Sequence, residues 1–328
     1  FSKDLMKKYG IPTAKYETFD DPAKVMAYIK AEGKYPVVIK ADGLALGKGV
    51  LICENEQQAA DGVKEIMLDK KFGASGNHVV VEEFLTGPEV SVLSFTDGKV
   101  VKPMVSSMDH KRANDHDTGL NTGGMGTVAP NPYYTSEIAA ECMEKIFLPT
   151  IHAMNAEGCP FKGCLYFGLM LTPDGPKVIE YNCRFGDPET QVVLPLLEGD
   201  LLHIMEACTN GTLADEEVKF SDGAAACVIL ASGGYPVAYE KGKPISGLVD
   251  GQLPDEENVT VYHSGTALTE DGQLVTNGGR VLGVTATGPR LTNALSHAYE
   301  AAEKIHFDKL HKRSDIGLRA LKALAEKQ

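Results

Sequence analysis

Positive charge is scarce in this chain, and the scarcity limits the partners that we expect. The 32 Lys and Arg residues stand against 45 Asp and Glu residues, which gives a formal net charge of −13 at pH 7. An acidic protein is not drawn electrostatically to a nucleic-acid backbone or to an anionic membrane. We therefore expect neither nucleic acid nor a membrane as a partner, and any bound phosphate must be held by local groups.

Spacings typical of disulfide frameworks and zinc sites are missing as well. The seven cysteines form no C-x-x-C pair, and the nine histidines form no H-E-x-x-H or similar spacing. We expect reduced core cysteines in a cytoplasmic protein, and no dedicated zinc site. The cysteines are Cys53, Cys142, Cys159, Cys164, Cys183, Cys208 and Cys227.

Long apolar runs are the third absence. No run approaches the roughly 18 residues of a membrane-spanning helix, and the first residues show no signal-peptide pattern. The chain begins at Phe1 rather than at a methionine, so we expect sequence to be missing upstream. With 328 residues, of which 43% are hydrophobic, the chain is long enough for more than one domain.

Helix and strand signals are mixed along the chain. Asp21 and Pro22 mark a helix start, Asn55 caps a second helix, and Asp97-Gly98 is the turn of a predicted hairpin. Further helices are expected at residues 136–158, with a bend at Pro149, at 200–208 and at 292–305. Strands are expected at residues 37–41, 50–53, 78–84, 90–95, 100–105, 164–171 and 176–183.

Two stretches carry no periodic pattern. Residues 106–132 are rich in Gly, Asn, Asp and Thr and are interpreted as a long loop, which in compact domains is usually functional. Residues 215–222 are interpreted as a linker to a smaller β-rich unit with one helix.

The stretch VVIKADGLALGKGVLIC, residues 37–53, places a glycine-rich loop between two predicted strands. A P-loop needs four residues before its Gly-Lys, but only three separate Gly43 from Gly47, and Lys48 precedes Gly49 and a strand. A dinucleotide-binding unit is excluded as well, because the sequence has no strand followed by G-x-G-x-x-G and a helix. Two interpretations remain: a flap on a β-hairpin that closes over phosphates with Lys48 while Lys40 reaches them, or a surface hairpin with solvated lysines.

The stretch PKVIEYNCRFGDPE predicts a strand with one polar face. Because alternate side chains share a face, Glu180, Asn182 and Arg184 point one way. The other face, expected to point into a core, carries Ile179, Tyr181 and Cys183. Carboxylate and amide oxygens suit Mg²⁺, and a guanidinium suits a carboxylate or phosphate. The alternative is a solvated face with an ion pair.

Four strings occur in order along the chain: VVIKADGLALGKGV, VVVEEFLTGPE, SSMDHKRANDHDTGLNTGGMG and VIEYNCRFGDPETQ. Together they resemble the ATP-grasp ligases, specifically the glycinamide ribonucleotide synthetase family. The resemblance implies an α+β ATP-grasp fold in which two α+β subdomains clasp ATP, followed by a smaller β-rich C-terminal domain. It implies a central subdomain at residues 1–15 and 82–220, a lid with the flap at 16–81, and a C-terminal domain at 221–328.

The resemblance also implies roles for individual residues. Lys48 and Arg184 are implied to be catalytic, and Glu180 and Asn182 to bind Mg²⁺ or Mn²⁺. The implied ATP-binding residues are Lys40, Gly43, Gly47, Lys48, Gly49, Glu82, Glu83, Phe84, Leu85 and Glu89. The implied substrate-binding residues are Asp109, Lys111, Asp117, Gly124 and Arg184. For the charged residues of the loop, Arg112 among them, an ion pair within the loop is the alternative to substrate contact.

The reaction that the resemblance implies is ATP-driven amide formation between glycine and 5-phosphoribosylamine through a glycyl phosphate, in purine biosynthesis. It needs no protein nucleophile, because positioning and charge stabilisation supply the catalysis. Members of the family begin with a small α/β domain that is expected to be missing here and to act as a partner of this chain. We therefore expect MgATP binding but poor turnover by this chain alone.

Two alternatives stay open. A biotin-dependent carboxylase shares the Glu-x-Asn-x-Arg element, but the string Phe185-Gly186-Asp187-Pro188-Glu189 that follows does not match that group. The other alternative is a regulatory module that binds ATP without catalysis, against which the retained Glu180, Asn182 and Arg184 argue.

Overall fold

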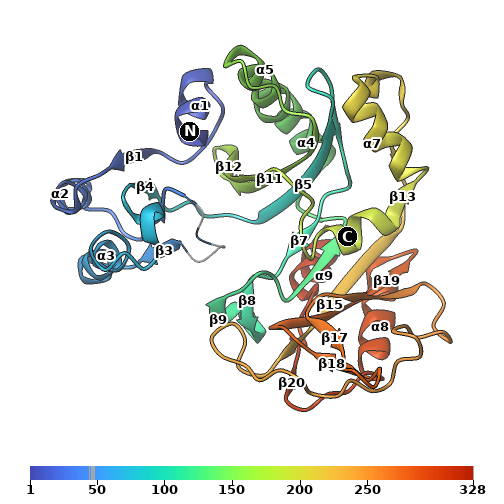
Figure 1. The fold of residues 1–328 in the computed structure, drawn as a ribbon. Coiled ribbons are helices and arrows are strands. Elements are labelled where there is room, and N and C mark those ends of the chain that lie inside the picture. The colour runs from blue at the N-terminus through green and yellow to red at the C-terminus, as the bar shows by residue number, and fades with distance from the viewer. Residues whose placement is uncertain (44, 46–48, 328) are drawn as a thin grey trace. The chain divides into compact units, whose positions relative to one another are not determined.

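The computed structural model describes residues 1–43, 45 and 49–327 (Figure 1). By their contacts the residues form two compact units. The first unit comprises Phe1–Gly87 with Met170–Ile179, and the second comprises Pro88–Leu169 with the chain from Glu180 onward. The division into three parts with boundaries at residues 15, 82 and 221 stays a prediction.

The first unit is built on an antiparallel four-stranded sheet. Its strand order is β1-β4-β2-β3, formed by Tyr16–Phe19, Val79–Glu83, Val37–Ala41 and Val50–Cys53. The helices are α1 (Ser2–Tyr9), α2 (Pro22–Glu32) and α3 (Glu56–Val63), and a π-helical turn at Lys64–Leu68 and a 3₁₀ turn at Gly73–Gly76 follow α3. The predicted caps are confirmed, because Asp21 accepts from the backbone of Ala23 and Asn55 from that of Gln58.

The second unit contains a four-stranded sheet and, later in the chain, several helices. The strand order is β12-β11-β5-β6, formed by Gly175–Asn182, Gly163–Thr172, Glu89–Thr96 and Val101–Pro103. Residues 170–179 of the β11–β12 hairpin group with the first unit. The hairpin predicted at Asp97-Gly98 is confirmed by the β5–β6 pairing.

The long helix predicted at residues 136–158 has an irregular centre. It comprises α4 (Ser136–Cys142), a π-helical turn (Met143–Phe147) and α5 (Leu148–Ala156), with Pro149 in the first turn of α5. Proline has no N–H to donate to the preceding turn, which accounts for the irregular hydrogen bonding just before it. Later in the chain come α6 (Thr190–Val193), a 3₁₀ turn at Leu194–Leu196, and α7 (Leu201–Asn210), which Asp200 caps.

A six-stranded sheet forms the rest of the second unit. Along its path the order is β16-β19-β15-β10-β7, formed by Val259–His263, Arg280–Gly288, Ala224–Ser232, Gly126–Ala129 and Met108–Asp109, while β20 (Leu310–His311) pairs with β15. Helix α8 (Leu291–Ala302) packs its alanines onto β15 and β19, and α9 (Leu318–Ala325) follows near the C-terminus. Smaller ladders join β8 (Arg112–Asn114) to β9 (Thr118–Asn121), β13 (Leu197–Glu198) to β14 (Lys219–Phe220), and β17 (Thr266–Leu268) to β18 (Leu274–Thr276).

Three predictions about these segments are wrong. Residues 106–132 are not a loop throughout, because β10 is a fully buried strand between β15 and β7. The predicted linker at 215–222 contains a paired strand, β14, preceded by a 3₁₀ turn at Leu213–Asp215. The last unit has α9 in addition to the one expected helix. The strand β10 has four residues and β14 has two, so neither is long enough to show a periodic sequence pattern. Their positions are set by tertiary pairing.

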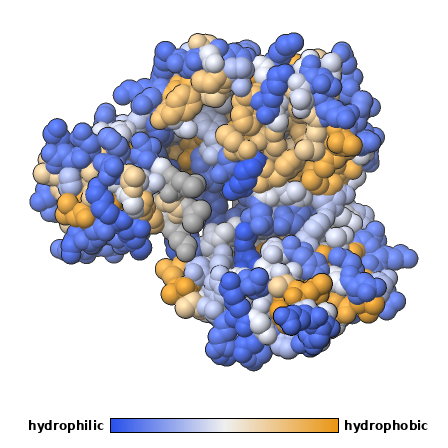
Figure 2. All heavy atoms as spheres, viewed as in Figure 1, coloured by the Kyte–Doolittle hydropathy of each residue, from blue (hydrophilic) through white to orange (hydrophobic). Residues whose placement is uncertain are grey.

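The cysteine prediction is partly wrong. All seven cysteines are free, as expected, but Cys159 and Cys183 are exposed rather than in the core. The alternation that was to bury Cys183 stops because β12 ends at Asn182. Among the described residues no helix has the length and hydropathy of a membrane span. Hydrophilic and apolar residues are interspersed on the face of the molecule drawn in Figure 2.

Candidate active site

In the second unit, Lys111 lies between two carboxylates that come from different strands. Its Nζ is 3.3 Å from Oε2 of Glu89 at the start of β5 and 3.9 Å from Oε1 of Glu180 on β12. Burial alone would lower the pKa of Lys111, but Glu89 and Glu180 outweigh it, so that the pKa lies well above its usual value. The lysine is therefore a fixed positive charge, and the structure brings together three of the predicted site residues.

A second feature of this centre is a buried carboxyl pair, Asp109 and Glu189. Burial raises the pKa of Asp109 well above its usual value, and the charge of Glu189 raises it further. Burial likewise raises the pKa of Glu189, which is only 5% exposed. Because the two carboxyls interact, their protons belong to the pair, and the pair can hold a proton at a pH where isolated carboxyls are ionised.

Glu189 was not among the predicted site residues. Its Oε1 lies 3.4 Å from the Ser91 hydroxyl, which in turn is 2.8 Å from the Tyr166 hydroxyl, and all three side chains are buried. The only sequence signal was its place at the end of the string PKVIEYNCRFGDPE. Ser91 and Tyr166 lie within apolar strands, so the sequence did not distinguish them from core residues.

The polar face predicted on β12 is present up to the end of the strand. Glu180 and Asn182 are both on β12 and two residues apart, so their side chains leave the same face. Arg184 lies beyond the strand, is exposed, and donates from Nη1 to the carbonyl oxygen of Phe185 at 3.0 Å. Among the described residues no group of three or more His, Cys, Asp and Glu side chains could hold a metal. One carboxylate and one amide still fit Mg²⁺, which takes few protein ligands.

The glycine string after β9 is packed tightly against this centre. Gly124 is buried with φ of 117°, and a Cβ there would meet Asp109 Oδ1 at 2.7 Å and Pro188 Cδ at 2.5 Å. The N–H groups of Gly123, Gly124 and Met125 donate to Tyr235, Thr122 and His110. These three donors are satisfied within the protein. The role of Gly124 in substrate binding therefore stays a prediction, and its observed role is close packing.

Two other charges of the predicted loop belong to the β8–β9 hairpin, Arg112 at the start of β8 and Asp117 in the turn. Asp117 pairs through Oδ1 with Arg313 at 2.9 Å and through Oδ2 with Arg319 at 3.3 Å. Arg112 donates from Nη1 to the carbonyl oxygen of Gly119 at 2.9 Å. Substrate contact by Asp117 stays a prediction, but both of its oxygens already have cationic partners.

The first unit holds a separate charged cluster around Glu82. This side chain is 5% exposed, and its oxygens lie 3.0 Å from Lys40 Nζ and 3.3 Å from Lys3 Nζ. Lys40 also donates to the carbonyl oxygen of Ile179 at 3.1 Å. Burial lowers the pKa of Lys3, and Glu82 only partly opposes this. The contact of Lys40 with ATP phosphate stays a prediction, as does the contact of residues 82–85 with adenine.

The rim of this cluster contains the other predicted ATP-binding residues. Glu83 accepts from the backbone N–H of Lys15 at 2.9 Å, Phe84 is 37% exposed, and Leu85 is buried. The predicted hairpin is confirmed, because Lys40 pairs with Val50 and Ala41 donates to the carbonyl oxygen of Gly49. Gly43 has no room for a side chain, since a Cβ would lie 2.5 Å from Ser75 Oγ. Gly47 and Lys48 lie outside the described residues.

A cleft of about 660 Å³ lies within the second unit. Its lining residues include Phe185, Asp187, Gln191, Tyr235, His263 and Arg280. Arg280 holds Asp187 through Nη2 to Oδ2 at 2.9 Å and donates to the carbonyl oxygen of Gly123 at 2.9 Å. Arg280 thus joins the segment around Gly123 to the segment around Asp187.

Comparison with known proteins first defines the class. A family model described as the phosphoribosylglycinamide synthetase ATP-grasp (A) domain matches residues 1–190, and the corresponding C domain matches residues 225–319. The chain therefore has the ATP-grasp fold, which implies the use of ATP. More particularly, it belongs to the phosphoribosylglycinamide synthetase family.

Individual relatives cover almost the whole chain. It is 46% identical to the phosphoribosylamine–glycine ligase of Vibrio parahaemolyticus over 328 residues, which is all of this chain and 75% of the relative. It is 46% identical to the trifunctional purine biosynthetic protein adenosine-3 of Gallus gallus, over 99% of this chain and 32% of the relative. The crystal structure of the phosphoribosylamine–glycine ligase of Thermotoga maritima matches with a TM-score of 0.87 at 38% identity, over 96% of this chain and 77% of that one.

The fold is shared more widely. A biotin carboxylase domain from Hydrogenobacter thermophilus, solved with MgADP and bicarbonate, matches with a TM-score of 0.72 at 17% identity, over 95% of this chain and 66% of that one. At this identity the likeness shows the fold alone.

Proposed function

We propose that this chain catalyses the ATP-dependent joining of glycine to 5-phosphoribosylamine, which gives glycinamide ribonucleotide, ADP and phosphate in the cytoplasm. Family membership supports the ligase activity and its place in purine biosynthesis. The observation in the structure that supports it best is Lys111, a permanent cation set between Glu89 and Glu180 and next to a buried carboxyl pair. A zwitterionic amino acid and a phosphorylated amine need charges of both signs at one place.

The first step of the proposed reaction activates glycine. A carboxylate oxygen of glycine attacks the γ-phosphorus of ATP, the bond to the ADP oxygen breaks, and glycyl phosphate forms. Lys111 and Arg184 are assigned to the carboxylate and phosphoryl oxygens, on which negative charge is carried through the transfer. Glu180 and Asn182 would hold Mg²⁺ or Mn²⁺, whose charge offsets that of the phosphates.

In the second step the amine of phosphoribosylamine attacks the carbonyl carbon of glycyl phosphate. The amide C–N bond forms, inorganic phosphate leaves, and the attacking nitrogen gives up a proton. The Asp109–Glu189 pair is the assigned proton acceptor, because its raised pKa values match it to proton transfer near neutral pH better than an ordinary carboxylate. No protein nucleophile takes part.

Residues of the first unit, and Glu89 of the second, are assigned to ATP. Lys40 and Lys48 take the phosphates, Gly43, Gly47 and Gly49 form the flap, and the backbone of Glu82, Glu83, Phe84 and Leu85 takes the adenine. Glu89 takes the ribose hydroxyls, since a carboxylate only accepts hydrogen bonds and suits a diol. The Lys3–Glu82–Lys40 cluster supports this, because its two lysines exceed its one carboxylate.

The test is ADP release measured with MgATP, glycine and phosphoribosylamine together, and then with each omitted. Release that needs both glycine and the amine is the expected result. Release that is indifferent to glycine would rule out the ligase, and release that depends on bicarbonate would favour a carboxylase.

The same assay tests Arg184. The variant Arg184→Ala is expected to raise the KM for glycine by about tenfold or more while the KM for ATP changes little, because a charged hydrogen bond to the carboxylate is lost. Lys145→Met, which removes an exposed lysine paired with Glu141, is the control. An unchanged glycine requirement in Arg184→Ala would remove Arg184 from the substrate site.

A further inference from the structure

Arg313 is the largest fully buried side chain among the described residues, although it carries a permanent charge. Nε and Nη2 donate to the two oxygens of Asp315 at 2.7 and 2.9 Å. Nη1 donates to Asp117 Oδ1 at 2.9 Å and to the carbonyl oxygen of Arg112 at 3.1 Å. All three guanidinium nitrogens are used, and only a planar fork can hold Asp315 at two points while it reaches the hairpin with a third nitrogen.

The hairpin end that Arg313 holds has an unfavourable backbone. His116 and Asp117 are consecutive non-glycine residues in the left-handed region, with φ of 59° and 53°. Such residues are strained and persist only where neighbouring contacts hold them. Those contacts come from the same C-terminal segment: the backbone N–H of His116 donates to Asp315 Oδ2 at 2.8 Å, and Asp115 accepts from both the backbone and the hydroxyl of Ser314.

The C-terminal segment also holds the base of the hairpin. Burial lowers the pKa of His110 to about 4, so its ring is neutral at ordinary pH. Its Nε2 accepts from the backbone N–H of Gly317 at 3.1 Å, which leaves Nδ1 to donate to the carbonyl oxygen of Gly126 at 3.1 Å. His311 lies 2.8 Å from the carbonyl oxygen of Ala113. Residues 311–317 thus contact the hairpin at its base, middle and end.

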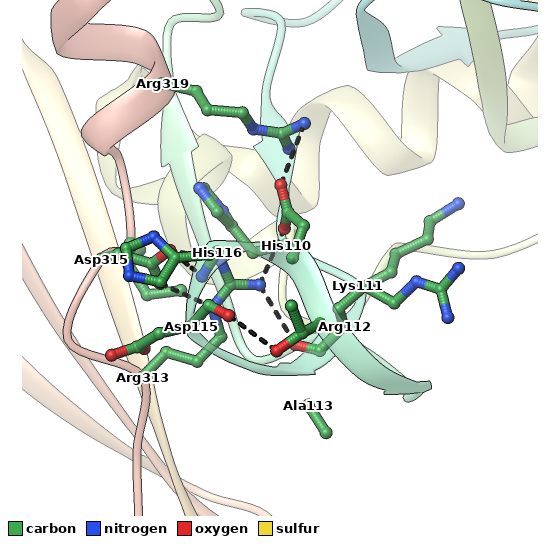
Figure 3. Close-up of polar contacts among 12 residues, drawn as sticks. His110, Lys111, Arg112, Ala113, Asp115, His116, Arg313, Asp315 and Arg319 are labelled. Carbon is green, nitrogen blue, oxygen red and sulfur yellow. Dashed lines mark hydrogen bonds and ion pairs between the residues drawn. The ribbon is translucent and has the colours of Figure 1, made fainter.

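Two charged residues of the candidate site, Lys111 and Arg112, lie between these contacts in the sequence. Lys111 and Arg112 are adjacent, and the carbonyl oxygen of Lys111 accepts from both the backbone N–H and the hydroxyl of Thr122 at 2.8 Å. In Figure 3 the Lys111 side chain points away from the Arg313 cluster. Arg313 therefore touches the backbone from which Lys111 projects but not the Lys111 ammonium group.

We propose that Arg313 is a positioning residue for the ligase: with residues 311–317 it locks the β8–β9 hairpin so that Asp109 and Lys111 project at the geometry that the reaction needs. The inference rests on the proposed function. It assigns to the C-terminal domain a part in the chemistry, through the backbone of residues 109–117 rather than through contact with a substrate.

The test compares Arg313→Lys with wild type. Lysine keeps the positive charge but cannot bind Asp315 at two points and also reach Asp117. We expect kcat/KM for phosphoribosylamine and glycine to fall by about 10- to 100-fold, the loss that a small misplacement of reacting groups causes, while the KM for ATP stays within about twofold. Hydrogen exchange is expected to rise at residues 110–124 and to stay unchanged in β2 and β4. Lys312→Met is the matched control, because Lys312 pairs with Glu303 and not with the hairpin.

A second variant identifies the contact responsible. Asp117→Asn removes the hairpin's charged partner of Arg313, so it should slow the reaction and raise exchange in the same segment. The double variant should be about as impaired as the worse single variant, since both changes break one contact. Added guanidinium ion at low, non-denaturing concentration should partly restore activity to Arg313→Ala but not to Lys111→Met.

Two outcomes would overturn the proposal. In one, the β8–β9 segment exchanges faster in Arg313→Lys but the kinetic constants for both substrates are unchanged. In the other, all kinetic constants and the exchange of both units change together, which marks a general loss of stability. A wild-type chain without glycine-dependent ADP release would instead contradict the proposed function, and the exchange data would still report whether Arg313 locks the hairpin.

Discussion

The two units each contain a cluster of lysine and glutamate, buried in the first unit and partly exposed in the second, and the clusters have opposite compositions. Around Glu82 there are two ammonium groups, from Lys3 and Lys40, for one carboxylate. Around Lys111 there are two carboxylates, from Glu89 and Glu180, for one ammonium group, and the Asp109–Glu189 pair lies close by. The first excess is positive and suits phosphate oxygens, whereas the second is negative and suits a metal ion or an amine. The difference indicates that the ratio of lysine to glutamate in such a cluster decides whether it suits a negatively or a positively charged ligand.

Removing the one cation of the second cluster should have the largest effect. In Lys111→Met, Glu89 and Glu180 lose their shared partner, and the developing negative charge of the transferred phosphoryl group loses a preorganised cation. We expect kcat to fall by about 10²- to 10³-fold. The measurement is glycine-dependent ADP release, with Lys145→Met as control. A change below about threefold would show that the cluster's charge ratio does not matter for the reaction.

Removing the one carboxylate of the first cluster should act mainly on stability. Glu82→Gln leaves Lys3 and Lys40 facing each other without a counter-charge in a buried place. Breaking such a partnership costs about 3 kcal/mol of unfolding free energy, measured by urea denaturation. Glu83→Gln is the matched control, because its side chain is 44% exposed and its pairing with Lys177 is at the surface. Equal losses in the two variants would contradict the central place of Glu82.

The smallest effect is expected from acid, through His110 beside the second cluster. Its pKa is about 4 in the folded chain and near 6.5 when unfolded. The unfolded state therefore binds the proton first, and His110 contributes stability that is complete above the unfolded pKa and is lost as pH falls from about 6.5 toward 4. Down to about pH 5 the loss is about 2 kcal/mol, which is less than we expect for Glu82→Gln.

The measurement is the unfolding free energy of wild type and His110→Asn between about pH 7.5 and pH 5, with imidazole titration followed by NMR. The wild type should lose more stability over this range than the variant. Parallel curves, or a titration near pH 6.5, would contradict the neutral ring between Gly126 and Gly317.

Local features of the fold could be predicted from the sequence. The caps at Asp21 and Asn55, the β2–β3 hairpin and the polar face of β12 depend on residues within a few positions of one another. The strand β10 and the pairing of β14 could not be predicted, because neighbours far along the chain decide them.

The candidate site divides in the same way. Glu180 and Asn182 lay in a string whose alternation placed them on one polar face, and Asp109 and Lys111 lay in a string that the family resemblance singled out. Glu189 was not marked in this way, because its importance comes from burial next to Asp109, and no pattern of spacing reports burial of a single carboxyl after a proline. Arg313 was equally hidden, since its partner Asp117 is 196 residues away.

That separation has a consequence for synthesis of the chain. A ribosome completes residues 109–117 long before residues 311–317, and the contact between Gly317 and His110 spans 207 residues. A nascent chain cannot lock the strained turn at His116 and Asp117 until almost the last part of the protein has emerged. Premature termination within this final stretch would therefore leave a product that has most of its core but lacks the contacts that hold the β8–β9 hairpin.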